Sequence, residues 1–169
     1  MAYTSVPRFL DIEYSETEDG LLPTAMSWSL ADGRMKVVVI EPDEAWLAYD
    51  EMPDVDLRYL QEQGVPLIEL ARALHEDLPD QVVYVDGLDP DDALVEMIFE
   101  AVGMEQPFEL APVSELITGL HRADIEDARQ ALIFQEGLDP LLPETGVYAL
   151  LLLAHQAGLV ETGEDSGDL

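Results

Sequence analysis

Two acidic residues that could do chemistry together lie two positions apart near the start of the chain. Asp11 and Glu13 alternate with apolar residues in the segment 8–15 (RFLDIEYS), a pattern typical of a β-strand. Since strand side chains alternate between the two faces, both carboxylates project from one face, roughly 6–7 Å apart. That spacing suits two carboxylates that share a pair of divalent cations about 4 Å apart, as two-metal phosphodiester hydrolysis requires. The alternative is a solvated acidic strand face, because acid-x-acid pairs arise often by chance in so acidic a chain.

A second acidic position lies where a predicted helix follows a predicted strand. Asp91 comes shortly after the β-branched segment 81–85, and apolar residues three and four positions later share its side of the helix. An acid there overhangs the carboxyl end of the preceding strand. Asp86 and Asp92 compete for the same role. Helix capping accounts for Asp89, which we expect at the N-cap, and could account for Asp91 as well.

A third candidate group spans residues 121–129 (HRADIEDAR). A helix through this segment places Asp124 on the apolar face and Asp127 at its margin, whereas Glu126 points away. His121, just before the acidic helix, could serve as general base for a metal-bound water. The alternative is an ordinary amphipathic helix preceded by a surface histidine.

The order of these three groups resembles the DEDDh 3′–5′ exonuclease family, the proofreading-exonuclease branch of the RNase H-like fold. The resemblance covers about residues 7–157, and the segments that carry it are 9–13 (FLDIE), 84–87 (YVDG) continuing through 91 to 95, and 121–123 (HRA) with 127–129 (DAR). Pro90 stands where the family usually has an aromatic residue before the second-motif aspartate.

The resemblance also implies site residues. Two Mg²⁺ or Mn²⁺ ions would be held by Asp11, Glu13, Asp91 and Asp127. His121 would activate the attacking water. The family usually has its last aspartate five positions after the histidine, where this chain has Glu126. We expect Asp127 to take that role, because the helix phase and the Ala-Arg that follows it both favour the later residue.

The remaining pattern predicts the elements that must position these residues. Strands are expected at 8–15, 24–30, 35–40 and 81–85, with a hairpin turn at 31–34 and an extended piece at 107–112; residues 41–56 are expected as a loop, and helices from Pro66 to Leu78 and at 89–102, 113–119, 122–135 and 146–157. This order predicts an α/β fold with a mixed five-stranded sheet and helices on its faces, which the resemblance makes RNase H-like. We expect residues 1–160 to form a single RNase H-like exonuclease domain and residues 161–169 to be an acidic disordered tail.

Charge restricts the possible partners. The chain has 169 residues with 7 Lys+Arg and 37 Asp+Glu, which gives a net charge of −30. It therefore lacks the basic stripe of the usual nucleic-acid binder and is not expected to dock on an anionic membrane. There is no cysteine, which excludes disulfides, thiolate zinc sites and thiol nucleophiles. We expect a cytoplasmic protein, and a composition with one lysine, Lys36, suggests a high-salt host.

Three functions follow as hypotheses. The leading one is a metal-dependent 3′–5′ exonuclease that hydrolyses terminal nucleotides from short single-stranded DNA or RNA by a two-metal mechanism. The alternative is a catalytically weakened RNase H-like domain that acts as a binding module. A third is an acidic adaptor or nucleic-acid mimic. The orientation of Asp127 separates the first two, because an enzyme needs that carboxylate directed at Asp11 and a binding module allows it to face solvent.

Overall fold

The computed structural model describes residues 7–17, 20–46, 57–79, 81–117, 122–139, 142 and 144–156. The predicted general base His121 and the predicted tail at 161–169 lie outside the described residues.

The described residues form five strands and six α-helices. The strands are β1 (Arg8–Thr17), β2 (Gly20–Ser29), β3 (Met35–Val39), β4 (Gln81–Val85) and β5 (Phe108–Pro112). The α-helices are α1 (Leu57–Gln63), α2 (Leu67–Asp77), α3 (Leu88–Val102), α4 (Val113–Leu116), α5 (Arg122–Gln135) and α6 (Thr145–Gln156), and a short 3₁₀ turn, η1, covers Glu44–Trp46. Each predicted strand and helix has its counterpart, with shifts at several ends, whereas α1 was not predicted.

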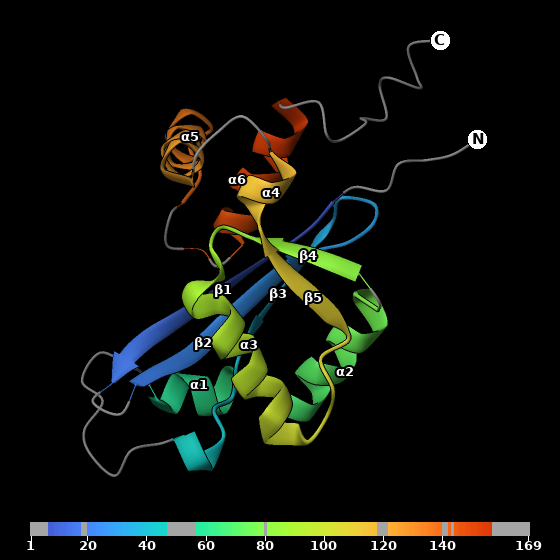
Figure 1. Ribbon diagram of the computed structural model, residues 1–169. Coiled ribbons are helices and arrows are strands. Elements are labelled where there is room, and N and C mark those ends of the chain that lie inside the picture. Colours follow the sequence, from blue (N-terminus) through green and yellow to red (C-terminus); the bar gives the residue numbers. More distant parts are fainter. Residues whose placement is uncertain are drawn as a thin grey trace.

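The strands make one mixed sheet in the order β3-β2-β1-β4-β5 (Figure 1). β1 pairs antiparallel with β2, which pairs antiparallel with β3. β4 pairs parallel with both β1 and β5, because each parallel connection passes through helices. The predicted α/β class and five-stranded mixed sheet are therefore confirmed.

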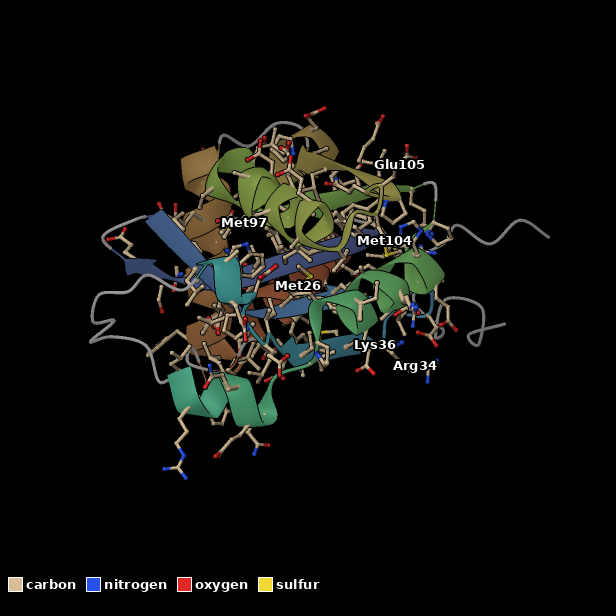
Figure 2. All side chains as sticks on the ribbon, turned by 90° about the horizontal axis from the view of Figure 1, so that it is seen from below. Met26, Arg34, Lys36, Met97, Met104 and Glu105 are labelled. Atoms are coloured by element: carbon tan, nitrogen blue, oxygen red, sulfur yellow. The ribbon has the colours of Figure 1, made fainter. Side chains whose placement is uncertain are left out.

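Helices cover both faces of the sheet, and the alternation of side chains along β1 explains how. Leu10 and Ile12 belong to a buried cluster with residues of α2 and α3, and Met26 of β2 lies within that layer (Figure 2). Phe9 points the other way and packs with residues of α4, α5 and α6. By the same alternation Asp11 lies on the Phe9 side, which is the side of α5 and α6.

A partly buried polar network joins β2 and β3 to helix α2. The indole Nε1 of Trp28 donates a hydrogen bond of 2.9 Å to Asp77, and Lys36 Nζ lies 2.8 Å from the same carboxylate. The one lysine of the chain therefore joins β3 to α2 and is not part of a basic surface.

Helix α3 begins earlier than its sequence predicts. Its N-cap is Gly87, so the expected cap at Asp89 is wrong. The helix ends as predicted at Gly103, whose φ of 67° lies in the left-handed region that glycine adopts most easily. In the part of the chain that the structure describes, no helix is long and apolar enough to cross a membrane.

Candidate functional site

Two aspartates meet where β1 and β4 stop pairing. The last paired residues are Phe9 and Tyr84, and Asp11 and Asp86 each come two positions later in the chain. Because the two strands are parallel, the equal offset brings both carboxylates to the same place beside the carboxyl end of β4.

The third aspartate comes from the first turns of α3. Asp91 is buried, with 8% of its surface exposed, and it lines the same cavity as Asp11 and Asp86. Within the described residues its carboxylate has no hydrogen-bond or ion-pair partner. The sequence left open whether Asp86 or Asp91 belongs to this site, and the structure places both there.

A positive charge lies among these carboxylates. Arg129 of α5 places Nη1 3.0 Å from Oδ2 of Asp86 and Nη2 3.6 Å from Oδ1 of Asp11. Its side chain is only 12% exposed, so water screens these ion pairs less than it screens surface pairs. Oδ1 of Asp86 and Nε of Arg129 are buried and have no hydrogen-bond partner among the described residues.

Helix α6 leaves room for the guanidinium because its second residue is a glycine. A Cβ built on Gly146 would lie 2.5 Å from Oδ2 and 2.9 Å from Cγ of Asp11. It would also meet Nη2 of Arg129. Real Cβ atoms do not approach neighbours that closely, so any side chain at position 146 would displace Arg129 or Asp11.

Three acids at this place, Asp11, Glu13 and Asp91, have raised pKa values. Burial raises the pKa of Asp91 to about 7, and the charges of Asp11 and Asp86 add to the effect while Arg129 opposes it. Burial also raises the pKa of Asp11; Arg129 lowers it and Asp86 raises it. The pKa of Glu13 is raised by burial, then by Asp11 and by Glu144. When ionised, these neighbouring carboxylates therefore carry more negative charge than the groups around them stabilise.

The charged groups line a cavity of about 200 Å³, called here the acidic cavity. Its charged lining is Asp11, Asp86, Asp91 and Arg129. The rest of the wall comes from Ile12, Tyr14, Gly87 and Pro90. When all of its lining acids are ionised its formal charge is 1 − 3 = −2.

The structure brings together some of the predicted site residues and separates others. Asp11 and Asp91 line the acidic cavity, and Glu13 lies beside it, within electrostatic reach of Asp11. Asp127 is exposed and does not line the cavity, and Glu126 is exposed as well. The residue of α5 that reaches the carboxylates is Arg129, two positions after Asp127.

This arrangement does not fit the pair of divalent ions that the resemblance implies. Asp127, the expected fourth ligand, is exposed outside the cavity. Two of the carboxylates that line the cavity, Asp11 and Asp86, already face the Arg129 guanidinium. A two-metal centre would require the Arg129 guanidinium to move away from Asp11 and Asp86. The two-metal centre therefore stays a prediction of the exonuclease hypothesis.

Sequence reasoning missed Arg129, Gly146 and Glu144. Arg129 is part of the third motif, where the sequence indicates the register of the helix but does not show that this arginine pairs with the acids. Gly146 carried a local signal, since glycine in the first turn of a helix weakens it and calls for a reason. Glu144 has no signal in the sequence, because its effect on Glu13 depends on how α6 packs against β1.

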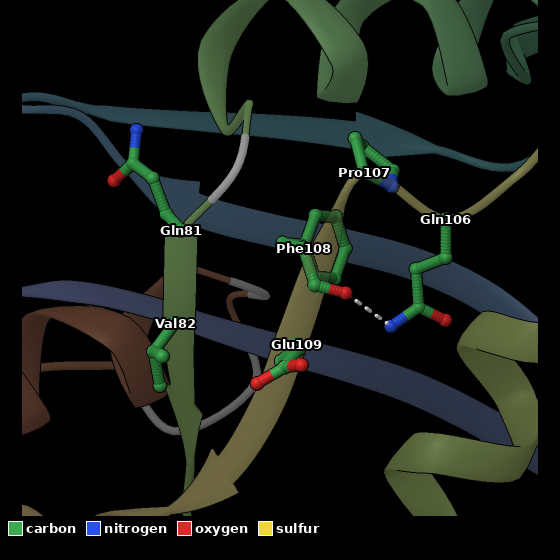
Figure 3. Close-up of a pocket in the computed structure, with 6 residues that line it drawn as sticks. All are labelled: Gln81, Val82, Gln106, Pro107, Phe108 and Glu109. Carbon is green, nitrogen blue, oxygen red and sulfur yellow. Dashed lines mark hydrogen bonds between the residues drawn. The ribbon is translucent and has the colours of Figure 1, made fainter.

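Another cavity, of about 390 Å³, lies at the amino-terminal ends of β4 and β5, away from the acidic cavity (Figure 3). Its wall includes Gln81, Val82 and Glu109, and Gln106 donates a hydrogen bond of 2.8 Å to the carbonyl of Phe108. It contains none of the predicted site residues and no cluster of charge, so it adds nothing to the candidate site.

Comparison with protein-family models finds no match to this chain, and comparison with curated proteins finds none either.

Proposed function

We propose that this chain is an RNase H-like domain of the DEDDh exonuclease type that acts as a binding module at its acidic cavity. In this proposal Arg129 supplies the positive charge that metal ions would supply in a nuclease, and the domain binds a ligand without hydrolysing nucleic acid. The observation that carries the proposal is the position of the Arg129 guanidinium, 3.0 Å from Asp86 and 3.6 Å from Asp11.

The fold supports the RNase H-like part of the proposal. Three antiparallel strands precede two parallel strands in the order β3-β2-β1-β4-β5, with helices on both faces. The resemblance implies a mixed five-stranded sheet with helices on its faces, and this arrangement is consistent with it. Asp11 and Asp91, which the resemblance assigns to its first two acidic motifs, both line the acidic cavity, and this supports the proposal further.

The third motif supports loss of hydrolysis. Asp127 is exposed, which is the orientation expected of the binding module. Gly146 provides the space that the guanidinium needs beside Asp11. The net charge of −30 also opposes long polynucleotides, because phosphate contacts depend on Lys and Arg.

Metal-dependent 3′–5′ exonuclease activity is the second candidate. A specific observation favours it: the charge of Asp11 raises the pKa of both Glu13 and Asp91, so three of the four predicted metal ligands are electrostatically coupled. Divalent ions bound there would stabilise the negative charges of these neighbouring carboxylates, provided that Arg129 moved away.

A nuclease assay separates the two candidates. Short single-stranded DNA and RNA labelled at the 5′ end are incubated with the full chain and Mn²⁺ or Mg²⁺, at low and high salt. The matched control is the double variant Asp11→Asn/Asp91→Asn, which reveals any contaminating nuclease. We expect no shortening above that control; Mn²⁺-dependent shortening from the 3′ end that the double variant lacks would establish the exonuclease instead.

A further inference from the structure

Asp91 is the acid of the cavity that the protein itself leaves without a partner. Only 8% of the surface of this residue is exposed, and no donor among the described residues reaches its carboxylate. A carboxylate in so enclosed a position is stabilised by a hydrogen-bond donor, and native proteins normally supply one. Asp86 lines the same cavity, and its Oδ1, a buried atom, is also unpaired within the described part of the chain.

The donor that suits this acid best is one that carries positive charge. Three carboxylates against one guanidinium leave the cavity with an excess of negative charge, which disfavours phosphate and other anions. A hydroxyl group donates one hydrogen bond, whereas an ammonium group donates three and accepts none. The carboxylate oxygens of Asp91, which have no partner among the described residues, are acceptors of the kind that an ammonium group satisfies.

The size of the cavity favours an organic cation. Its volume of about 200 Å³ is that of roughly six or seven water molecules at about 30 Å³ each, which far exceeds a bare metal ion. Most of the surface that lines it is polar, so the charged head group of such a cation, and not its carbon chain, would make the main contacts. Arg129 already holds Asp11 and Asp86, so a divalent ion that needed those carboxylates would have to displace it.

We infer that the acidic cavity binds a primary ammonium group at the end of a short alkyl chain, with Asp91 as its main anchor. This inference rests on the proposed function and names the class of ligand. The ammonium group belongs either to a free diamine or to a lysine side chain of a partner protein, and the two sources present the same chemistry to the cavity. The net charge of −30 would attract either of them.

Calorimetric titration of the full chain tests the inference. The probes are 1,4-diaminobutane, a short peptide with one lysine and blocked ends, tetramethylammonium, 1,4-bis(trimethylammonio)butane and MgCl₂. Tetramethylammonium is the matched control for the peptide and 1,4-bis(trimethylammonio)butane for the diamine, since each carries the same charge as its amine but has no N–H donor. We expect 1,4-diaminobutane or the peptide to bind at least about tenfold more tightly than its own control, which corresponds to about 1.4 kcal/mol.

A pair of variants locates the binding. Asp91→Asn should weaken amine binding at least about tenfold. Glu96→Gln, which removes a charge from an exposed position of the same helix, should change it less than about twofold. Binding of the diamine alone assigns the site to a free amine, and binding of the peptide alone assigns it to a partner's lysine; either supports the inference. The comparison of probes on the unmodified chain decides the matter even if Asp91→Asn does not fold.

Three results would overturn the inference. They are absence of binding by both amines, equally tight binding of the matched quaternary ammonium control, and amine binding that Asp91→Asn leaves unchanged. If these occur in a chain that shows no nuclease activity, the binding-module proposal survives without its ligand. Binding of Mg²⁺ in place of the amines, together with nuclease activity, would instead contradict the proposed function itself.

Discussion

Nη1 of Arg129 lies 3.0 Å from Oδ2 of Asp86, so an ion pair ties helix α5 to the carboxyl end of strand β4. The same guanidinium faces Asp11 of β1, and the three residues come from distant parts of the chain. Removing one member of a buried pair costs more than the pair itself contributes, because the remaining charge loses its partner. The stability of the fold and the chemistry of the acidic cavity therefore depend on one side chain.

Replacement of Arg129 should be strongly destabilising. Arg129→Ala leaves Asp11 and Asp86 facing each other without a counter-charge, and we expect the free energy of unfolding to fall by about 2–4 kcal/mol. Arg58→Ala is the control, since Arg58 pairs with Glu62 on the surface and its loss should cost less than about 0.5 kcal/mol. Urea unfolding of both variants measures the difference. Equal, small losses would show that the ion pairs of Arg129 contribute little.

Gly146→Ala should also destabilise, although alanine normally favours a helix by about 1 kcal/mol over glycine. The new Cβ would lie against the carboxylate of Asp11 and against Arg129, and we expect a cost of about 1–3 kcal/mol from overpacking. In the Arg129→Ala background one of the two clashes is gone, so the cost should be smaller. A double-mutant cycle measures this coupling; additive losses would mean that Gly146 makes no room for Arg129.

Asp91 should make stability fall as pH rises. Its pKa is about 7 in the folded chain and about 3.9 when unfolded, so the folded state binds more protons between these values. The destabilisation is absent below about pH 4, grows as pH rises and is complete above about pH 7. Asp91→Asn removes this pH-dependent destabilisation. The free energy of unfolding of the variant, relative to that of the unmodified chain, should therefore be at least about 1 kcal/mol higher at pH 8 than at pH 5.

Denaturant unfolding at the two pH values measures that gain, with Glu96→Gln as the control for loss of one negative charge from α3. The raised pKa values of Asp11 and Glu13 act in the same direction, so part of the slope remains in the Asp91→Asn variant. A gain that is the same at both pH values would show that Asp91 ionises normally in the folded protein.

Asp127→Asn and Glu126→Gln should both be nearly silent. Both carboxylates are exposed, and surface substitutions usually change stability by less than about 0.5 kcal/mol. Amine binding should be unaffected as well, since neither residue lines the acidic cavity. Selective loss of a Mn²⁺-dependent nuclease activity in Asp127→Asn would show instead that this residue is a metal ligand.

Much of the fold follows from local sequence patterns. The alternation around Asp11 predicts β1 and its two faces, and the Gly103 stop and the β-branched segment 81–85 predict the end of α3 and strand β4. Helix α1 was missed, because it is short and buries only Leu60, so it carries no extended apolar stripe. The N-cap of α3 was misplaced because Gly87 caps through its backbone conformation and not through a side chain.

The site was predictable only in its first two parts. Strand alternation and position after β4 are local properties, and they brought Asp11 and Asp91 to one cavity. The third motif depends on how α5 is rotated and how it approaches the sheet. A residue at the edge of the apolar face, such as Asp127, can point either way, so the helical pattern alone does not determine this. Arg129 has a long side chain that reaches the carboxylates from a partly buried position, whereas the shorter Asp127 is exposed.

The central claim is that Arg129 holds the place of metal ions among Asp11, Asp86 and Asp91. A crystal soaked with Mn²⁺ and a nucleoside monophosphate tests it most directly, through anomalous scattering from the metal. We predict that the guanidinium stays within ion-pair distance of Asp86 and Asp11 and that no Mn²⁺ lies between Asp11 and Asp91. Two Mn²⁺ ions bridging these carboxylates, with Arg129 displaced, would contradict the account and establish the metal centre of an exonuclease.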